Sequence, residues 1–198
     1  MASPPDWHKV EEVLFDQGKA AIMQFASEHS HEQCSFFACY ADPFEGLFEY
    51  CFDTFNNAIR MAMKTESEAI EYKNMMLRRD WLWKQAKILT NHPHIVDYAP
   101  FTGLFAYTPY TEITFDGWLG FVDSEDYPEK KDGEDDYLEG NTRMIIWRVF
   151  DRFIENHLFQ HLHMTSPFRL GYQFHDSDLI VLRILNWPQL SSEVNPIN

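Results

Sequence analysis

Three histidines near the end of a predicted helix have a spacing that could hold a metal ion. His157 and His161 are four residues apart, and His163 follows two residues later. Residues four apart on a helix point the same way, so two imidazoles could share one ion in a metal-dependent hydrolase. No glutamate stands between them in the HExxH order, and a third ligand would have to come from elsewhere. We therefore interpret His157 as a partly buried structural histidine and predict no metal site.

A second group of titratable side chains is the acidic segment from Asp123 to Glu139. It holds nine carboxylates against two lysines, so its net charge is −7, nearly half of the −15 of the whole chain. Like charges this close repel one another, which favours a solvated loop or a surface that meets a cationic partner. Two tyrosines within the segment could act as anchors while the carboxylates steer the partner. The candidate binding residues are Asp123, Glu125, Asp126, Tyr127, Glu129, Asp132, Glu134, Asp135, Asp136, Tyr137 and Glu139.

The acidic composition excludes several classes of partner. A nucleic-acid backbone or an anionic bilayer would be repelled over a screening length of about 8 Å, so a basic protein is the expected partner. No window approaches the roughly 20 apolar residues that a membrane-spanning helix needs. Residues 1–9 lack the cationic and then apolar pattern of a secretory signal. We expect a soluble, cytoplasmic protein.

Other catalytic signatures are absent from the sequence. It contains no GxGxxG, GxxxxGK, GxSxG or CxxC pattern. Paired carboxylates are abundant, but the acidic segment is too polar to separate two pKa values as a hydrolase requires. Cys34, Cys39 and Cys51 lie among strand-like aromatic residues, which predicts reduced thiols in the core. We therefore predict neither an enzyme nor a cofactor.

The first half of the sequence predicts a helix, a hairpin and more helices. Apolar residues recur every three or four positions over Trp7–Glu28, and Pro4, Pro5 and Asp6 are typical of the entry to a helix. The aromatic runs Ser35–Tyr40 and Leu47–Phe52 predict two antiparallel strands joined by a short turn. Further helical segments are expected from near Asn57, with Asp53 or Thr54 as its cap, over Thr65–Leu77, and over Asp80–Leu89.

The second half begins with three short β-branched or aromatic runs. Leu104–Tyr107, Glu112–Phe115 and Trp118–Val122 predict a meander of strands. After the acidic segment, Asn141 or Thr142 would cap a helix from about Arg143 to Leu162.

The last expected strand is Leu179–Leu185, where both parities are apolar apart from Arg183, which predicts a strand covered on both sides. Gly171–Phe174 is its expected partner, and residues 188–198 are expected to fray. The whole chain, 1–198, predicts a single α+β domain with a mostly antiparallel sheet and helices packed on it. The acidic segment, about 123–140, would be an insertion in that domain.

The order of elements from Asp6 onward resembles small bacterial immunity proteins encoded next to polymorphic toxins. The resemblance is carried by the leading helix with Trp7, the strand SFFACYADPFEG (Ser35–Gly46) and the segment FDTFNNAI (Phe52–Ile59). In particular the chain resembles the domain of unknown function 4303 family over roughly residues 6–85. The resemblance implies a non-catalytic cytoplasmic protein that binds and blocks a cognate toxin, often one delivered by type VI or contact-dependent secretion.

Two classes of function follow. The first is an immunity protein whose acidic segment neutralises a basic toxin, for instance a nuclease whose own site holds phosphate. The alternative is a metal-dependent hydrolase that uses His157 and His161. A scaffold or regulatory module with a basic ligand would differ from the first only in its partner.

Overall fold

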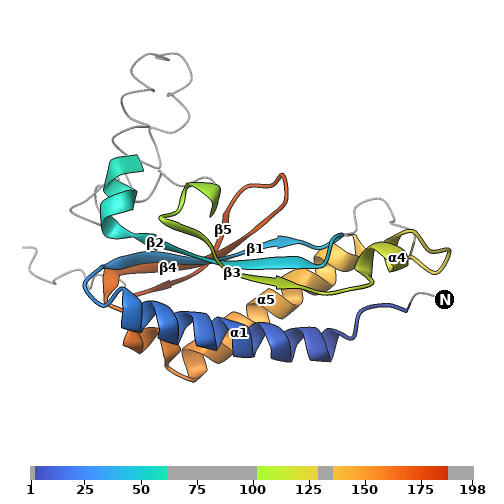
Figure 1. Cartoon of the computed structure of the whole chain (residues 1–198), viewed down its shortest axis with the longest axis horizontal. Helices are drawn as coiled ribbons and strands as arrows, with labels where there is room; N and C mark the ends of the chain where they lie inside the picture. Colours follow the sequence, from blue (N-terminus) through green and yellow to red (C-terminus); the bar gives the residue numbers. More distant parts are fainter. Residues whose placement is uncertain (1–2, 62–101, 129–135, 187–198) are drawn as a thin grey trace, which may run out of the picture.

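The structure is a computed structural model that describes residues 3–61, 102–128 and 136–186. At its centre lies a five-stranded sheet with the strand order β3-β2-β1-β4-β5 (Figure 1). β1 and β4 run parallel, and the other three neighbouring pairs are antiparallel. The α+β class with a mostly antiparallel sheet is therefore confirmed. The elements are α1 (Trp7–Glu28), β1 (Cys34–Asp42), β2 (Leu47–Thr54), the 3-10 helix η3 (Thr102–Leu104), β3 (Tyr107–Thr114), α4 (Trp118–Val122), α5 (Tyr137–Glu155), the 3-10 helix η4 (Leu158–His161), β4 (Met164–Phe174) and β5 (Ile180–Leu185).

The helix α1 begins and ends where the apolar repeat predicts. The Asp6 carboxylate accepts the Lys9 backbone N–H at 3.2 Å and so caps the first turn. The face that carries Leu14 and Phe25 is buried against the sheet. The hydroxyl of Tyr50 on β2 donates to the Leu14 carbonyl at 2.8 Å, which fixes the helix on the strand below it.

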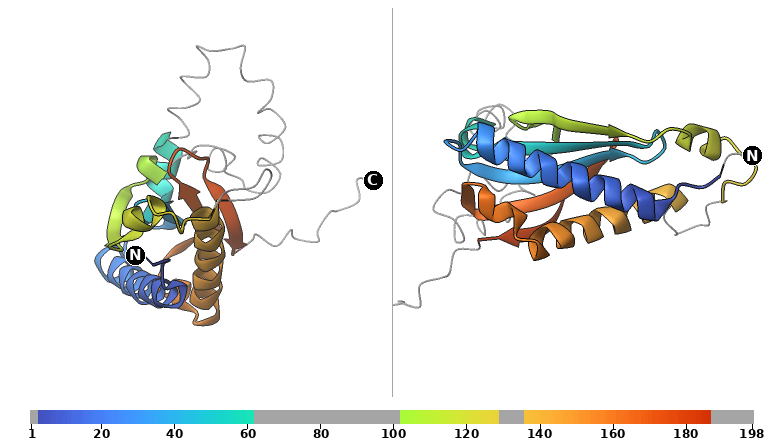
Figure 2. Two further views of the ribbon diagram at one scale, coloured as in Figure 1. Left: turned by 90° about the vertical axis from the view of Figure 1, so that its right-hand side faces the viewer. Right: turned by 60° about the horizontal axis from the view of Figure 1, so that its bottom comes forward.

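Both long helices cover one face of the sheet, as Figures 1 and 2 show. Arg152 of α5 joins them: its guanidinium lies 4.0 Å from the centre of the Phe15 ring of α1. The same group donates to Glu12 at 2.8 Å and to Glu11 at 3.3 Å. A cation that stacks on a ring while it is paired with carboxylates ties α1 to α5 along their shared edge.

Gly18 permits the close approach of α1 to its neighbours. A Cβ at this position would lie 2.3 Å from Cζ of Phe153 on α5 and 2.9 Å from the Tyr50 ring. Both rings are almost fully buried, so neither can move aside easily. The spacing between the helix layer and the sheet therefore depends on a missing side chain.

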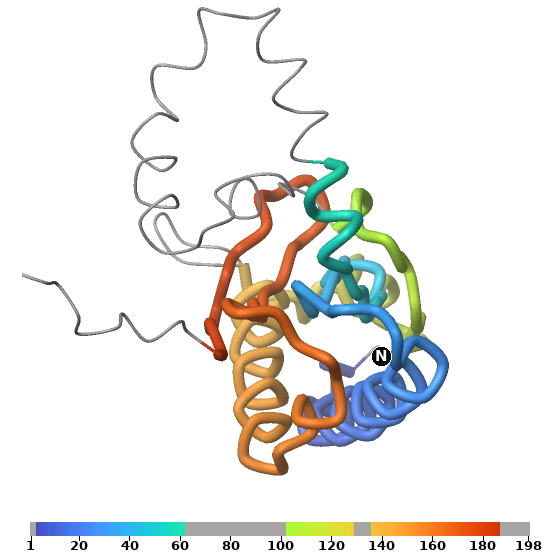
Figure 3. Tube along the Cα trace, turned by 90° about the vertical axis from the view of Figure 1, so that its left-hand side faces the viewer, coloured from blue at the N-terminus to red at the C-terminus, as the bar shows by residue number. Residues whose placement is uncertain are grey.

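The predicted hairpin is confirmed as β1 and β2, which pair with Ala38 opposite Cys51. The face of the hairpin opposite α1 and α5 carries Phe36, Ala38 and Cys51, which form a small buried cluster with Phe105. Residues 55–61 are helical and lie on this side of the sheet (Figure 3). The three cysteines are free thiols buried in the sheet, as the sequence predicts.

The predicted strand over Trp118–Val122 is wrong, because these residues form the short helix α4. Trp118 and Phe121, three residues apart, are 4% and 2% exposed, whereas Leu119 between them is 57% exposed. That is a helical period, and Gly117 with φ +89° turns the chain into it. The predicted strand Leu104–Tyr107 is wrong except for Tyr107, where β3 begins, because Leu104 ends η3 and the two residues between them form a bend. The predicted strand Glu112–Phe115 is confirmed as the end of β3, apart from Phe115.

The predicted helix Arg143–Leu162 is displaced toward the N-terminus. α5 spans Tyr137–Glu155, and Asp136 caps it instead of Asn141 or Thr142. Thr142 is buried inside the helix. At the other end His157 has φ +56°, a left-handed conformation that cannot continue an α-helix.

The prediction that the last strand is covered on both sides is also wrong. Among the described strands β5 is the outermost one beside β4, and its Ile180, Val181 and Ile184 are 43%, 45% and 42% exposed. Its neighbour β4 is the buried strand of the pair, and the expected pairing with β4 is confirmed. A register shift opposite Leu182 places one extra residue in β5. Apolar residues at odd and at even positions of β5, such as Val181 and Ile184, therefore project from the same face of the sheet.

The predicted helices Thr65–Leu77 and Asp80–Leu89 and the frayed tail lie outside the described residues. Among the helices that are described, none has the length and apolar character needed to cross a bilayer.

Replacing Gly18 with Ala should destabilise the protein, although alanine favours a helix by about 1 kcal/mol. The new methyl group meets two buried rings, and overpacking of this kind costs about 1–3 kcal/mol. Urea unfolding followed by circular dichroism measures the difference. Gln17→Ala, at the exposed neighbouring position, is the control and should be nearly neutral. Equal stability of both variants would contradict the tight packing described for Gly18.

Candidate protein-binding surface

An aromatic cluster holds together the three elements that surround the acidic segment. We define it as Trp7 of α1, Trp118 of α4 and Tyr137 of α5. The centroid of the Trp7 ring lies 5.2 Å from that of Trp118 and 6.1 Å from that of Tyr137, with both pairs edge to face. The indole N–H of Trp7 donates to the Tyr137 hydroxyl at 3.1 Å. These contacts fix the start of each helix relative to the others.

Tyr127 and Asp136 fasten the two sides of the acidic segment to each other. The Tyr127 hydroxyl donates to the Asp136 carboxylate, which also accepts the Leu138 backbone N–H at 2.9 Å as the N-cap of α5. Burial, and then the bond to Asp136, raise the pKa of Tyr127, so its hydroxyl remains a neutral donor. The ring packs against Phe121 at a centroid distance of 5.4 Å. The segment therefore leaves the body of the protein and returns to it at neighbouring points.

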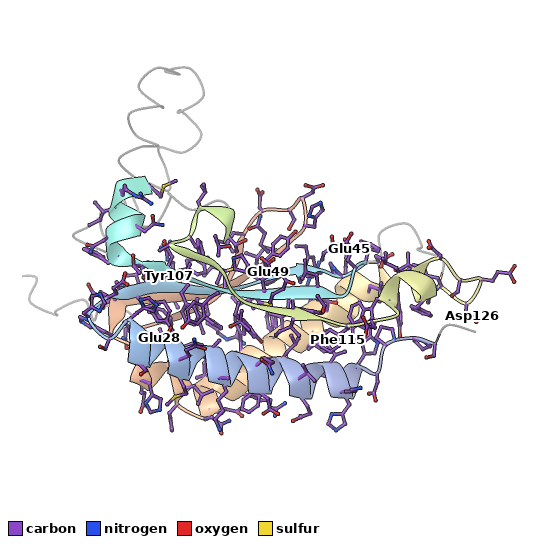
Figure 4. The ribbon with its side chains drawn as sticks, viewed as in Figure 1. Glu28, Glu45, Glu49, Tyr107, Phe115 and Asp126 are labelled. Carbon is purple, nitrogen blue, oxygen red and sulfur yellow. The ribbon has the colours of Figure 1, made fainter. Side chains whose placement is uncertain are left out.

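The carboxylates between these anchors are displayed to solvent where they are described. Asp123, Glu125 and Asp126 are exposed in the turn that follows α4. Figure 4 shows Asp126 in this loop, at one end of the molecule. Glu139 lies in the first turn of α5 and is partly buried, where a negative charge suits the helix dipole. The remaining predicted binding residues, Glu129, Asp132, Glu134 and Asp135, lie outside the described residues.

The two tyrosines of the segment have structural contacts of their own. The rings of Tyr127 and Tyr137 are partly buried, and both hydroxyls take part in hydrogen bonds within the chain. They thus support the loop and the aromatic cluster. Their predicted role as anchors for a partner stays a prediction.

The turn between β1 and β2 brings further carboxylates to the same end. A Cβ on Gly46 would lie 2.8 Å from the Phe115 carbonyl and 2.9 Å from the Trp118 ring, so the turn packs directly on the start of α4. This packing places the exposed Glu45 beside α4, and Asp116 is exposed just before it. We define the acidic end by its exposed carboxylates: Glu45, Asp116, Asp123, Glu125 and Asp126.

Negative charge continues from the acidic end along the outer face of the sheet. Glu49 on β2 stands directly opposite Glu112 on β3. Burial, and then this like charge, raise the pKa of Glu49. Figure 4 shows Glu45 and Glu49 on this side of the sheet, whereas Tyr107 and Phe115 lie nearer to α1. A facing pair of like charges costs stability and is relieved when a cation lies between them.

A groove of about 800 Å³ opens beside the acidic end. It runs between the N-terminal residues with the start of α1 on one side and the turn from β3 to α4 on the other. Phe115 and Trp118 form part of its wall, with Asp6 and Asp116 among the lining residues. Lys9 also lines the groove, so charges of both signs lie beside its aromatic wall.

The histidines do not have the helical spacing that the sequence suggests. His157 lies in the left-handed turn after α5, and His161 ends the separate 3-10 helix η4. His157, His161 and His163 are all exposed, so the prediction of a partly buried His157 is wrong. Within the described parts of the chain no group of three potential metal ligands comes together.

Sequence reasoning missed a buried polar cluster on the outer face of the sheet. Asp53, at the end of β2, is fully buried, whereas the sequence predicts for it only a possible helix cap. Its Oδ1 accepts the Asn57 side-chain N–H at 2.6 Å and the Ala106 backbone N–H at 3.1 Å. Thr54 makes the predicted cap, because its hydroxyl accepts the Asn57 backbone N–H at 3.3 Å. The sequence signal was a polar run, DTFNN, directly after a buried strand.

Arg169 of β4 supplies the positive charge that faces Asp53. Burial lowers the pKa of Arg169 to about 10, and the charge of Asp53 acts in the opposite direction. The guanidinium lies 4.8 Å from the centre of the Phe36 ring. For Asp53, burial raises the pKa to about 6, although its hydrogen bonds and Arg169 favour the charged form. An ionisable pair held among aromatic rings stabilises one arrangement of β2, β4 and residues 55–61.

The chain was compared with family models, with curated proteins and with solved structures. None of the three comparisons found a match.

Replacing Asp136 with Ala should lower the free energy of unfolding by about 1 kcal/mol, because α5 loses its N-cap. Asn also caps helices well, so Asp136→Asn is the matched control and should keep most of the stability. Urea denaturation of both variants gives the comparison. Identical losses in the two variants would show that the charge of Asp136, and not its cap, stabilises this end.

The buried Asp53 should make stability depend on pH. Its pKa is about 6 when folded and 3.8 ordinarily, so the folded state holds the proton more tightly. The corresponding stabilisation is complete below about pH 4 and is lost as the pH rises through about 6. A shift of about two pKa units corresponds to about 3 kcal/mol. The stability of Asp53→Asn relative to wild type should therefore rise by up to that amount between about pH 4 and 7.

Urea unfolding of the two proteins at a series of pH values measures this difference. A difference that is constant over this range would show that Asp53 does not titrate between its ordinary pKa and the raised one.

Proposed function

We propose that the protein is an immunity protein that binds and neutralises a basic toxin in the cytoplasm, and that the acidic end is its docking surface. The observation that carries the proposal is the display of Asp123, Glu125 and Asp126 on a loop that is fastened on both sides. Tyr127 and Asp136 are bonded to each other, so the charges cannot disperse as they would on a free tail. A fixed concentration of carboxylates is what electrostatic recognition of a cationic protein requires.

Charge gives this surface a kinetic advantage. Complementary potentials raise association rates by about 10- to 1,000-fold at low salt, and the gain falls as salt screens the charges. An inhibitor must reach its toxin before damage occurs, so a fast association is useful in itself. A nuclease toxin fits this chemistry, because a site that holds phosphate presents cations that a carboxylate surface can cover.

The resemblance to bacterial immunity proteins supplies the biological setting for the proposal. It concerns the leading helix and the hairpin, which form the scaffold under the acidic end in this structure. In this proposal the helix and the hairpin are a scaffold shared among immunity proteins. The charged loop is the part that distinguishes one toxin from another. Recognition by loops on a rigid support is frequent in binding proteins.

The first test identifies the partner and its charge. The tagged full-length protein is used to capture proteins from its host, and mass spectrometry identifies those retained at low salt and released at high salt. The proposal expects a basic protein whose toxicity to cells is suppressed when this chain is expressed with it. A captured partner that is acidic, or whose activity continues in the complex, would overturn the proposal.

The second test measures association with that partner by stopped flow at several salt concentrations. The double variant Asp123→Asn with Asp126→Asn should slow association about tenfold at low salt and flatten its salt dependence. The control carries the same charge change at two exposed sites away from the loop, Asp16→Asn with Glu155→Gln. Equal effects of the two double variants would show that net charge alone, and not the acidic end, determines the rate.

A further inference from the structure

The turn between β3 and α4 contains a dipeptide that can react with itself. Asp116 and Gly117 form this turn, and both residues are exposed. When glycine follows aspartate, the glycine nitrogen can attack the aspartate carboxyl group, because no Cβ on the second residue blocks the approach. The product is a five-membered cyclic imide. A fold suppresses this reaction when it holds the nitrogen or the carboxylate in hydrogen bonds, so the partners of these two groups decide whether it occurs.

Neither of the two reacting groups is held in place. In the part of the chain that the structure describes, no hydrogen bond or ion pair involves the Asp116 carboxylate, and the Gly117 backbone N–H donates to no acceptor. Gly117 has φ +89°, and a Cβ built on it would meet no atom within 4 Å, so the space beside it is open. The carboxylate is therefore free to turn back onto the nitrogen that follows it.

The two exposed aspartates that follow α4 are in a different situation. Asp123 is followed by Ser124, whose backbone N–H donates to the Phe121 carbonyl at 3.0 Å. Asp126 is followed by Tyr127, whose backbone N–H donates to the Ser124 carbonyl at 3.1 Å. Each of these nitrogens must first break a hydrogen bond, and each belongs to a residue with a side chain. Exposure alone therefore does not separate the three aspartates, whereas the free glycine nitrogen does.

We propose that Asp116 is a site of spontaneous isomerisation to isoaspartate. In the first step the Gly117 nitrogen forms a bond to Cγ of Asp116, and the hydroxyl of the carboxyl group leaves with the proton of the nitrogen as water. In the second step water opens the imide: attack at Cγ restores aspartate, and attack at the backbone carbonyl carbon leaves the chain connected through Cβ and Cγ. Water is released and then consumed, so no other reactant is required. This proposal does not rest on the proposed function, because it concerns the reactivity of the chain itself.

The isomerisation acts on a tightly packed neighbour. Isoaspartate adds an atom to the main chain just before Trp118, which is 4% exposed. The Trp118 ring lies 5.2 Å from the Trp7 ring between centroids, and a Cβ on Gly46 would lie 2.9 Å from it. A junction with so little free space cannot take up an additional main-chain atom unless Trp118 shifts. Isomerisation thus displaces the start of α4, and with it the carboxylates of the acidic end.

Peptide mapping of the full-length protein tests the proposal. The protein is incubated at neutral pH for several weeks, unfolded and cut after glutamate, which releases Ile113–Glu125 with both Asp116 and Asp123. Electron-transfer fragmentation distinguishes isoaspartate from aspartate at each position. Isoaspartate should accumulate at Asp116 and not at Asp123, which is the control within the same peptide. The other Asp-Gly pair of the sequence, Asp132–Gly133, falls in a different peptide and does not disturb the comparison.

A synthetic peptide of the same residues, Ile113–Glu125, measures how far the fold restrains the reaction. If the fold held the dipeptide, each increment of about 1.4 kcal/mol needed for local opening would slow the reaction about tenfold. The folded protein should therefore isomerise at Asp116 at a rate within about tenfold of that of the peptide. A slower rate than this, or equal accumulation of isoaspartate at Asp123, would overturn the proposal.

The variant Asp116→Glu tests the consequence for Trp118. It keeps the negative charge but should not react, because its longer side chain would have to close a six-membered ring, which forms far more slowly. After incubation the tryptophan emission of the wild type should move to longer wavelength, since Trp118 shifts toward water, whereas that of the variant should stay unchanged. Equal changes in the two proteins would overturn the inferred displacement of Trp118.

Discussion

Burial of aromatic rings between the sheet and the helix pair is the interaction on which the rest of the structure depends. Phe37, at the centre of β1, lies within 4.9–6.0 Å of rings from β2, α5 and η4. Each such pair contributes about 0.5–1.5 kcal/mol beyond the area that it buries. Gly18 allows α1 to approach this layer closely. The aromatic layer itself contains no charged side chain, so most of the charge of the chain lies outside it.

The acidic segment depends on this layer for its position. It has little apolar surface of its own, and its carboxylates repel one another. Trp7, Trp118 and Tyr137 extend the aromatic packing to the end of the molecule and hold the elements on either side. A repulsive loop is in this way fixed by attractive contacts at its base.

Local signals in the sequence were sufficient for the first half of the described chain. Asp6 and the apolar repeat predict α1 correctly, and two aromatic runs with a polar turn predict β1 and β2. Errors arose where tertiary contacts override local pattern. Trp118–Val122 has strand-like composition, but its burial follows a helical period. The charge of Asp136 predicts a binding residue, whereas its role as a cap depends on where α5 begins.

The hydrophobic periodicity of the sequence predicts neither the bulge in β5 nor the burial of Asp53. A strand with apolar residues at both parities predicts two covered faces, but one extra residue gives the same pattern at an edge. Asp53 resembled a cap because acids are common before helices. Its burial depends on Ala106, a residue 53 positions away, which no local window contains.

The hydrogen bonds of Asn57 and Asp53 have a consequence for how this fold can vary. Asn57 donates to Asp53 and, at 2.9 Å, to the carbonyl of Leu104, while Asp53 accepts from Ala106. These hydrogen bonds hold Asn57 and Leu104 next to each other beside the sheet, so the two ends of the chain segment between them are close together. Doubling the length of a closed loop costs only about 0.6 kcal/mol. That stretch could lengthen, shorten or exchange its sequence between relatives while the sheet and helices below it stay unchanged.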